Sequence, residues 1–336
     1  MVGYVYVSNT KGHRGSYQQL FASTFELAPV SGTLTSAVIF KLLRGEKAIF
    51  ATIGPGSFRQ LLLITLRGLI RKHTCAIWLG DPGEDAEGRQ GLKRREYLLL
   101  RACKRMRSVT ILTIFPPRDE RDGFALADDW IADPQLWDLV DVDKKRDLRS
   151  TALTHQIQKF RSGRAVLAFL GRGSRYKGYG AFVDYIRKRP GEFLGVSVGP
   201  IDKDCKVASA ELLRAGGIVI DKFASEPEFL SIYKEADYVW CAYSERYDRP
   251  SGIFGRAIAL GVTPIVRINS FLDWFAEQFE LRVCRLEDNA GDGTFPRKRS
   301  QVYNGARPVE NQDQKVLLHR LRKEALKKIS GALGGA

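Results

Sequence analysis

The chain has few of the residues and patterns that define a metal site, a disulfide framework or a membrane span. Its five cysteines are scattered along 336 residues, and no two of them form a C-x-x-C pair. This usage argues against a zinc site or a disulfide-stapled fold and favours reduced, packed cysteines. No apolar run is long enough for a spanning helix, and no targeting segment is evident near the N-terminus. We therefore expect the protein to be made and kept in the cytoplasm.

Acidic residues are outnumbered by basic ones. The 53 Lys and Arg residues against 38 Asp and Glu residues give a formal net charge of +15. Such a charge raises the local concentration of anions, and it suits nucleotides, phospholipid headgroups or nucleic acid without choosing among them. No recognised nucleic-acid module or aromatic-basic signature is present, so nucleic acid is the weakest of these three partners.

Strand-like apolar runs alternate with helical patterns along the whole chain, which is typical of α/β architecture with parallel sheets. The expected strands are residues 3–7, 47–52, 75–79, 109–114, 165–170, 193–198, 217–220, 237–242, 263–266 and 281–284. The charged stretch 141–164 lacks strand character and is expected to hold the interdomain connection. The pattern predicts two Rossmann-like domains facing a cleft, at residues 1–160 and 161–310, followed by a C-terminal helix, 311–336, that packs back on the first domain.

Residues 246–266 have the pattern of a turn, a helix start and a buried strand. Ser251 and Gly252 follow Pro250, and small residues there leave backbone amides uncovered at the helix N-terminus, where phosphate binds favourably. The alternative is an ordinary αβ unit in which Ser251 is the N-cap residue.

A second candidate anion site is the run G-R-G-S-R-Y-K-G at 171–178, directly after an expected strand. It is not a P-loop, because no Gly-Lys-Ser/Thr closes it, and Tyr176 stands where a dinucleotide fingerprint has its third glycine. Arg172, Arg175 and Lys177 beside this turn suit a diphosphate. The alternative is a solvated basic turn.

Taken together, three runs resemble the C-terminal nucleotide-binding domain of the GT-B glycosyltransferases, most closely family 4, also called group 1. They are G-R-x-x-x-x-K-G at 171–178, F-A-S-E-P-E-F-L at 223–230 and P-S-G-I-F-G-R-A-I-A-L-G at 250–261. The resemblance covers about residues 165–268 in order and spacing, and the N-terminal half only by its general α/β pattern. It implies a GT-B fold and a nucleotide diphosphate sugar as the donor.

The resemblance also assigns roles to individual positions. It places Arg172 and Lys177 on the donor diphosphate and the loop around Phe223 against the nucleotide base. It places the backbone amides at Ser251, Gly252 and Ile253 on the distal phosphate.

Two positions depart from the family pattern, which has glutamates flanking this helix start. Asp248 stands at the first and could still contact hydroxyls of the donor sugar. Arg256 stands at the second and cannot accept hydrogen bonds from a ribose diol, because a guanidinium only donates. Arg256 then either faces a phosphate or carboxylate of the donor or lies on the solvated side of its helix, and the second alternative is slightly favoured. The donor and the retaining stereochemistry that the family would imply stay open.

The N-terminal half is expected to bind the acceptor. The segment H-R-G-S-Y at 13–17 brings His13 and Arg14 to a glycine-containing loop where family members approach the transferred sugar. Asp81 follows the expected strand 75–79, where a base for an acceptor hydroxyl would be positioned. The alternatives are an incidental polar surface loop at His13 and a turn-forming role for Asp81 before Pro82.

No metal site is expected. Asp141 and Asp143 form a D-x-D motif like that of metal-dependent glycosyltransferases, but they lie in the charged connector and are interpreted as solvated charges. The histidines His73, His155 and His319 show no ligand spacing. A GT-B enzyme needs no metal, because cations and helix dipoles stabilise the leaving group.

Two basic amphipathic segments suggest a membrane surface. Residues 57–72 are mostly apolar, with Arg59, Arg67, Arg71 and Lys72 at one side or end, and residues 88–107 hold eight basic residues and one acidic one. Segments of this kind can lie on an anionic leaflet. The alternative is a pair of core-facing helices with charged outer faces.

We therefore predict a metal-independent glycosyltransferase of the hexosyltransferase type, without a cofactor besides its nucleotide-sugar donor. It would act on a saccharide or lipid-linked acceptor in cell-surface glycan biosynthesis, in the cytoplasm or on the inner face of the membrane. The alternatives are a GT-B-like sugar-nucleotide epimerase or pyruvyl transferase, which would form no glycosidic bond, and a nucleic-acid-binding protein.

Overall fold

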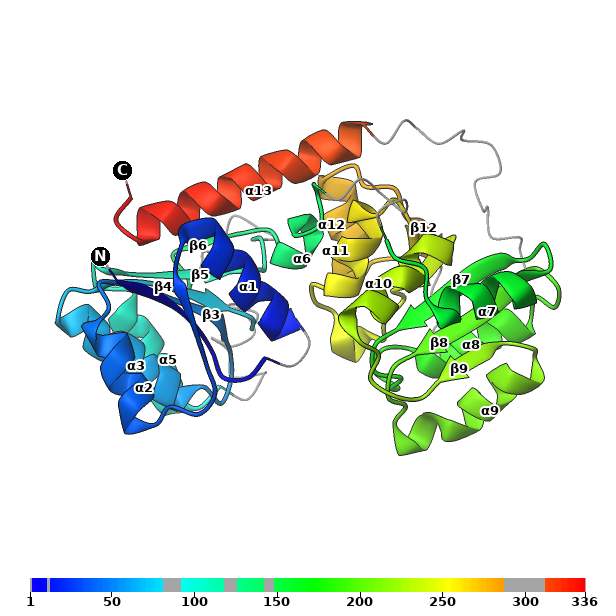
Figure 1. The fold of residues 1–336 in the computed structure, drawn as a ribbon, viewed down its shortest axis with the longest axis horizontal. Coiled ribbons are helices and arrows are strands. Elements are labelled where there is room, and N and C mark those ends of the chain that lie inside the picture. The colour runs from blue at the N-terminus through cyan, green and yellow to red at the C-terminus, as the bar shows by residue number, and fades with distance from the viewer. Residues whose placement is uncertain are drawn as a thin grey trace. The chain divides into compact units, whose positions relative to one another are not determined.

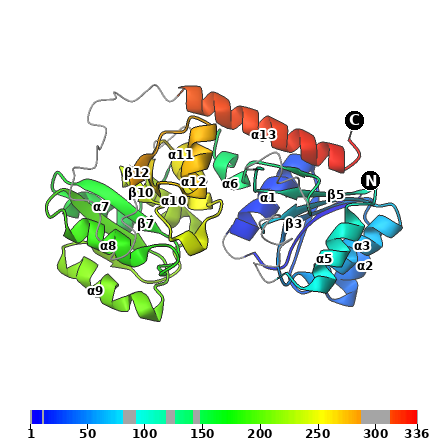
Figure 2. The same cartoon turned by 180° about the vertical axis from the view of Figure 1, so that it is seen from behind.

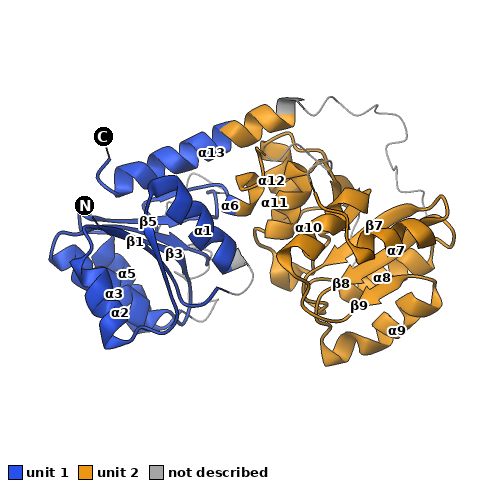
Figure 3. Cartoon of the chain, viewed as in Figure 1, with its two compact units in different colours: residues 1–134, 320–336 blue, residues 135–319 orange. Residues whose placement is uncertain are grey.

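A computed structural model describes residues 2–10, 13–80, 92–117, 126–141, 148–286 and 312–335. The chain divides into two compact units, shown in different colours in Figure 3. Unit 1 comprises residues 1–134 and 320–336, and unit 2 comprises residues 135–319. In the described ranges, no helix is both long and apolar enough to cross a membrane.

Unit 1 is built on a six-stranded parallel sheet with the order β2-β1-β3-β4-β5-β6. Its strands are β1 (Gly3–Val7), β2 (Ala28–Ser31), β3 (Lys47–Ile53), β4 (His73–Trp78), β5 (Val109–Thr113) and β6 (Asp129–Trp130). Its helices are α1 (His13–Phe25), α2 (Ser36–Arg44), α3 (Phe58–Leu69) and α5 (Arg94–Cys103). The strand order reverses after β2, so right-handed crossovers put α1 on one face of the sheet and α2, α3 and α5 on the other (Figures 1 and 2).

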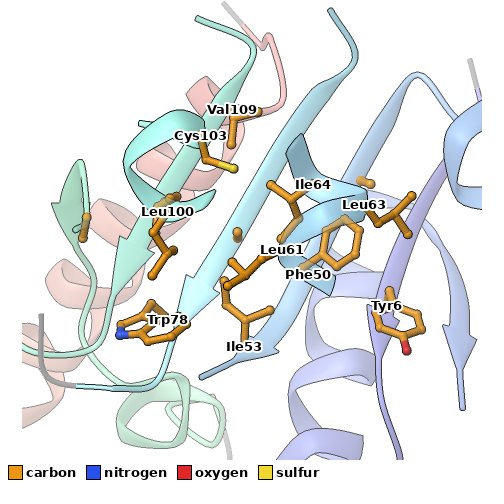
Figure 4. Packing of buried hydrophobic residues seen from close by; sticks show 14 of the residues in the cluster. Tyr6, Phe50, Ile53, Leu61, Leu63, Ile64, Trp78, Leu100, Cys103 and Val109 are labelled. Carbon is orange, nitrogen blue, oxygen red and sulfur yellow. The ribbon is translucent and has the colours of Figure 1, made fainter. Parts of the chain in front are cut away.

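The core of unit 1 lies between the sheet and this three-helix layer. Figure 4 shows Leu61 and Ile64 of α3 and Leu100 of α5 pointing toward Phe50 and Trp78 of the central strands. Burial on both faces explains why β3 and β4 are nearly continuous apolar runs.

Unit 2 repeats the architecture with the order β12-β11-β10-β7-β8-β9, again parallel throughout. The strands are β7 (Ala165–Leu170), β8 (Phe193–Val198), β9 (Ile218–Ile220), β10 (Tyr238–Trp240), β11 (Thr263–Arg267) and β12 (Cys284–Leu286). The helices are α6 (Pro134–Trp137), which begins at the last residue of unit 1, α7 (Ala152–Arg161), α8 (Tyr179–Arg187), α9 (Lys206–Arg214), α10 (Glu226–Glu235), α11 (Gly252–Ala259) and α12 (Phe271–Gln278). The short 3-10 helices η2 (Lys203–Cys205) and η3 (Glu245–Tyr247) lie in the loops after β8 and β10. The strand order reverses between β7 and β10, so α8 and α9 cover one face and α10, α11 and α12 the other.

The last helix, α13 (Gln312–Ala332), has its C-terminal part in unit 1. Lys328 Nζ donates to Asp129 Oδ1 at 2.9 Å and to the Trp130 carbonyl at 2.8 Å, and it lies over the Trp130 ring. Residues 320–336 therefore complete unit 1 at its edge strand β6. Residues 135–160, expected in the N-terminal domain, lie in unit 2, where α7 packs against α10.

The predicted α/β class with two Rossmann-like units is confirmed. Two strands have no counterpart in the sequence-based expectation. The edge strand β2 reads A-P-V-S and buries only Val30, while β6 has two residues. The expected strand 281–284 lies two to three residues later, as β12, because its pairing with β11 begins at Cys284.

Candidate functional site

The strongest candidate site lies at the carboxyl ends of β7 and β10, where the strand order of unit 2 reverses. The loops that leave two neighbouring strands at such a point diverge to opposite faces of the sheet and leave a crevice between them. Here the loops are residues 171–178 and 241–251, the two segments in which the sequence predicted anion binding.

The loop after β7 folds back on itself by means of glycines. Gly171 and Gly178 have φ angles of 88° and 69°, which disfavour a side chain. A Cβ on Gly178 would lie 2.6 Å from the Ala242 carbonyl oxygen, so this glycine also lets the two loops touch. A Cβ on Gly171 would lie 3.4 Å from Lys177 Nζ, so the lysine amine returns over the start of its own loop.

The Lys177 amine is surrounded by neutral groups. Nζ lies 5.9 Å from the ring centroids of both Tyr243 and Tyr247. Burial raises the pKa of both phenols, and it raises the pKa of the Cys241 thiol to about 12, so none of these groups supplies a negative charge near neutral pH. Among the described residues no carboxylate forms an ion pair with Lys177. Burial lowers the pKa of Lys177 below its ordinary value because the charged form is partly desolvated.

The start of α11 supplies backbone donors. Ser251 is its N-cap, and Ser251 Oγ accepts from the Phe254 amide at 3.5 Å. The amides of Gly252 and Ile253, in the first turn, have no hydrogen-bond partner among the described residues. Unsatisfied amides and the helix dipole make this end of α11 favourable for an anion.

Tyr243 connects the lysine to the helix start. Its ring packs under Lys177, and its hydroxyl forms a 2.8 Å hydrogen bond with Ser251 Oγ. Arg267 Nε donates to the Tyr243 carbonyl at 3.1 Å, which fixes the backbone of the same residue. Among the described residues, Lys177 is the only cation of the 171–178 loop that is not in an ion pair. The buried Tyr243 side chain therefore connects this cation to the backbone donors at the start of α11.

Packing gives a second reason for glycine in α11. A Cβ on Gly255 would lie 2.9 Å from backbone atoms of Gln135 and Leu136, and a Cβ on Gly252 would overlap the Gln135 side chain. The glycines of α11 are thus needed for close contact with α6, whose Gln135 side chain lies against the helix start.

The other two cations of the loop point away from Lys177. Arg172 Nε donates to Asp202 Oδ1 at 2.6 Å, and Arg175 Nε pairs with Asp204 Oδ2 at 2.9 Å. Their side chains are 70% and 77% exposed. Arg172 therefore lies at the rim, on the side of the loop that follows β8.

Asp248 is held by protein groups. Its Oδ1 accepts from the Phe271 amide at 2.6 Å and lies 3.7 Å from Arg267 Nη2. These contacts tie the 241–251 loop to the start of α12. Its contact with hydroxyls of the donor sugar stays a prediction.

The position of Arg256 differs from the predicted one. The sequence favoured a place on the solvated side of α11, but the side chain is only 4% exposed. Nη2 lies 2.9 Å from Asp138 Oδ2 and Nη1 lies 2.8 Å from Glu226 Oε1. The guanidinium of Arg256 can be buried because it pairs with these two carboxylates. Asp138 follows α6 and Glu226 is the first residue of α10, so no local sequence pattern around residue 256 reveals the pairing.

Phe223 lies in the loop after β9 and is 85% exposed, so its ring is available for stacking. The same loop enters α10, where Ser225 and Glu228 form a capping box. Glu226 then joins this loop to α11 through Arg256. The structure thus links all three segments that carried the family resemblance.

The candidate residues of unit 1 are less completely defined. His13 is the first residue of α1, after β1, and its side chain lies outside the described part of the structure. Arg14 Nη1 donates to Ser8 Oγ at 2.9 Å at the end of β1. Asp81 and Asp143 lie outside the described residues, and among the described residues no group of three His, Cys, Asp or Glu side chains is placed to hold a metal ion.

Sequence reasoning did not find Tyr243, Tyr247 or Arg267. The available signal was the aromatic and polar run C-A-Y-S-E-R-Y directly after an expected strand, at the edge where ligands bind in α/β sheets. Asp138, the buried partner of Arg256, had no such signal.

No protein-family model matches the chain, and no curated protein sequence matches it either. Solved structures do match. HepE from Anabaena in complex with UDP and glucose has a TM-score of 0.56 at 10% sequence identity, covering 99% of this chain and 97% of that one. The α,α-trehalose-6-phosphate synthase from Burkholderia multivorans has a TM-score of 0.55 at 10% identity, covering 94% of this chain and 79% of that one. The chain therefore has the GT-B fold, two Rossmann-like units each with a parallel sheet.

Proposed function

We propose that this protein is a glycosyltransferase that moves a sugar from a nucleotide diphosphate sugar to a saccharide or lipid-linked acceptor, in the assembly of cell-surface glycans. The GT-B fold supports the general class. The observation that carries the proposal is the Lys177 amine, which has no carboxylate partner among the described residues. Tyr243 connects it to the start of α11, where the amides of Gly252 and Ile253 have no hydrogen-bond partner among those residues.

This arrangement suits the leaving group of glycosyl transfer. As the bond between the sugar and the diphosphate breaks, negative charge grows on the distal phosphate. A fixed ammonium and fixed helix amides stabilise that charge without reorganisation, which is the main requirement for electrostatic catalysis. Lys177 would contact the diphosphate, and the amides of Gly252 and Ile253 would hold its distal phosphate. This set of donors performs the charge neutralisation that a divalent ion provides elsewhere, so we propose a metal-independent reaction.

The remaining roles follow from the sequence resemblance and the site. Arg172 would reach the diphosphate from the rim after releasing Asp202, and Phe223 would stack against the nucleotide base. Asp248 would contact donor hydroxyls. On the acceptor side, Asp81 would take the proton from the attacking hydroxyl, and His13 would lie close to the transferred sugar. The enzyme would act in the cytoplasm, at a membrane surface.

UDP is the first nucleotide to test, because the matching HepE structure contains UDP and glucose. A ligand that binds only the folded protein raises its melting temperature, so thermal shifts with UDP, GDP, CDP and TDP and their sugars identify the donor base. No shift with any of them would refute the proposal.

Product analysis then separates the reaction classes. Incubation with the donor and candidate acceptors should release the nucleoside diphosphate and form a glycosidic bond. An epimerised nucleotide sugar or a pyruvyl ketal would instead establish one of the alternative activities. A matched pair of variants strengthens the assignment: Lys177→Ala should abolish the nucleotide shift, while Arg175→Ala, which removes the same charge from the same loop at an exposed ion pair, should keep it.

A further inference from the structure

The outward face of α3 in unit 1 is apolar, which is unusual for a helix on a surface. Leu62, Leu66, Leu69 and Ile70 recur at helical spacing and are 42%, 41%, 66% and 52% exposed. We call these four residues the apolar ridge. The opposite face of the same helix fills the core through Leu61 and Ile64, as Figure 4 shows, so the ridge is additional to the residues that fold the unit.

The helices on both sides of α3 extend this surface. Phe40 of α2 and Leu98 of α5 are 60% and 56% exposed. Both helices pack against α3 in the same layer over the sheet (Figures 1 and 2). Exposed apolar side chains gathered on three adjacent helices mark an interaction site.

Cations surround the ridge. The exposed basic residues on and next to the three helices, which we call the basic rim, are Lys41, Arg44, Arg59, Arg71, Lys93, Arg94, Arg95, Arg101, Lys104, Arg105 and Arg107. Four of them lie over aromatic rings: Lys41 over Tyr4, Arg44 over Phe40, Arg95 over Phe58 and Arg101 over Tyr97.

Acidic residues are almost absent from these segments. Residues 36–72 and 93–107 contain two carboxylates, Glu46 and Glu96. Glu96 is buried at the start of α5, and Glu46 forms an ion pair with Lys72. Arg67, which the sequence placed among the surface cations, is fully buried and donates to the carbonyls of Leu42, Gly45 and His73. It stabilises the packing of α2 and α3 and is not part of the rim.

We infer that the apolar ridge and the basic rim form a docking surface for an anionic lipid bilayer. Leucine and isoleucine side chains gain free energy by entering the acyl boundary, and cations around them gain by lying among anionic headgroups. A bilayer provides both environments in one plane. A nucleic acid would neutralise the rim but leave the ridge in water, so the ridge selects the bilayer.

The position of α3 connects this surface to the binding edge of unit 1. The helix begins at Phe58, five residues after β3 ends at Ile53, so its first turn lies at the carboxyl edge of the sheet, where α/β proteins bind ligands. Docking would hold that edge beside the lipid headgroups, where a lipid-linked acceptor presents its glycan. This connection to an acceptor rests on the proposed function, whereas the docking itself does not.

The test is sedimentation of the full chain with vesicles, without donor or acceptor. Vesicles of phosphatidylcholine alone are compared with vesicles of equal parts phosphatidylcholine and phosphatidylglycerol. We expect binding only to the anionic vesicles, and weaker binding as salt rises, because headgroup attraction is screened. No binding, or equal binding to both vesicles at low salt, would overturn the inference.

Variants then separate the two components. Leu62→Ser with Leu66→Ser removes part of the ridge, and Arg94→Gln with Arg101→Gln removes part of the rim; each pair should weaken partitioning about tenfold or more. The matched control is Val207→Ser with Leu213→Ser on α9 of unit 2, which removes apolar side chains that are 72% and 54% exposed and should leave vesicle binding unchanged.

Two further measurements keep the outcome decisive. Circular dichroism and melting show whether each variant is folded, and the single change Leu69→Ser replaces the ridge pair if that pair unfolds.

Light scattering of the wild type tests self-association. If the wild type forms a dimer that the ridge variant dissociates, and does not bind vesicles, the ridge is an interface with a second copy of this chain and the inferred docking to a bilayer is refuted. Binding of UDP to all variants reports separately on unit 2, so failure of vesicle binding and failure of the proposed donor site are distinguishable.

Discussion

Replacing Lys177 by methionine should separate ligand binding from stability. Methionine has a similar length and an apolar surface, so it fills the space over Tyr243 and Tyr247 while removing the charge. Because Lys177 has no carboxylate partner within the described residues, the change leaves no buried carboxylate unpaired. It removes only the contacts of the ammonium group with the two rings and with a bound anion.

The two effects on the free protein have opposite signs. Two cation–π contacts near the distance limit are worth about 0.5 kcal/mol each, and their loss destabilises the variant. Removing a partly desolvated charge stabilises it, because burial disfavours the charged form of the amine. The net change should stay within about 1 kcal/mol, which for a unit of this size corresponds to a melting shift below about 4 °C.

The effect on binding should be larger. A charge-assisted hydrogen bond to phosphate is worth about 1.5–3 kcal/mol, so the Kd for UDP should rise roughly 10- to 150-fold. Calorimetry on the wild type, Lys177→Met and the control Arg175→Met measures this directly. The reasoning fails if Lys177→Met binds UDP within threefold of the wild type, or if its melting temperature falls by more than about 10 °C, which would make the lysine a structural residue.

The same lysine predicts a pH dependence. Its pKa is lowered in the folded protein, so between that pKa and the ordinary value of 10.5 the unfolded chain binds the proton and the folded chain does not. Stability should therefore rise with pH across this window, while affinity for UDP falls as the amine loses its charge. Both slopes should disappear in Lys177→Met, and a wild-type affinity independent of pH up to 10 would contradict the role given to the ammonium.

Further predictions concern neighbouring residues and metal. Arg172→Ala should weaken binding less than Lys177→Met, because its side chain is exposed and already paired with Asp202; a larger effect in calorimetry would make it the main phosphate ligand. Tyr243→Phe should raise the Kd for UDP a few-fold by removing a hydrogen bond worth about 1 kcal/mol at the N-cap of α11, and an unchanged Kd would show that the cap needs no support. Arg256→Met should lower the free energy of unfolding by about 3 kcal/mol, measured in urea, because it leaves Asp138 buried without this cation. Activity should survive excess EDTA, and loss of activity that manganese restores would require a metal-bridged diphosphate.

The sequence determined the order and type of most elements. Parallel strands buried on both faces must be apolar over their whole length, so β3, β4, β7 and β8 are visible as continuous runs. Turn chemistry is also local: glycine at 171 and 178 and a serine before α11 locate the two loops of the site without any tertiary information. The class of fold and the two segments of the donor site could be predicted for this reason.

The tertiary structure decided which side chains meet. From the sequence, Lys177 and Arg172 are equally good candidates for a phosphate ligand. In the structure, Lys177 lies against two tyrosines from the loop after β10, whereas Arg172 is held at the rim by Asp202 from the loop after β8. Arg256 is buried by carboxylates that are 118 and 30 positions away in the chain. Whether the apolar residues of α3 face the core or the surface depends on how the helix lies on the sheet. Charge partners and surface exposure are properties of packing between distant segments, and local pattern carries no information about them.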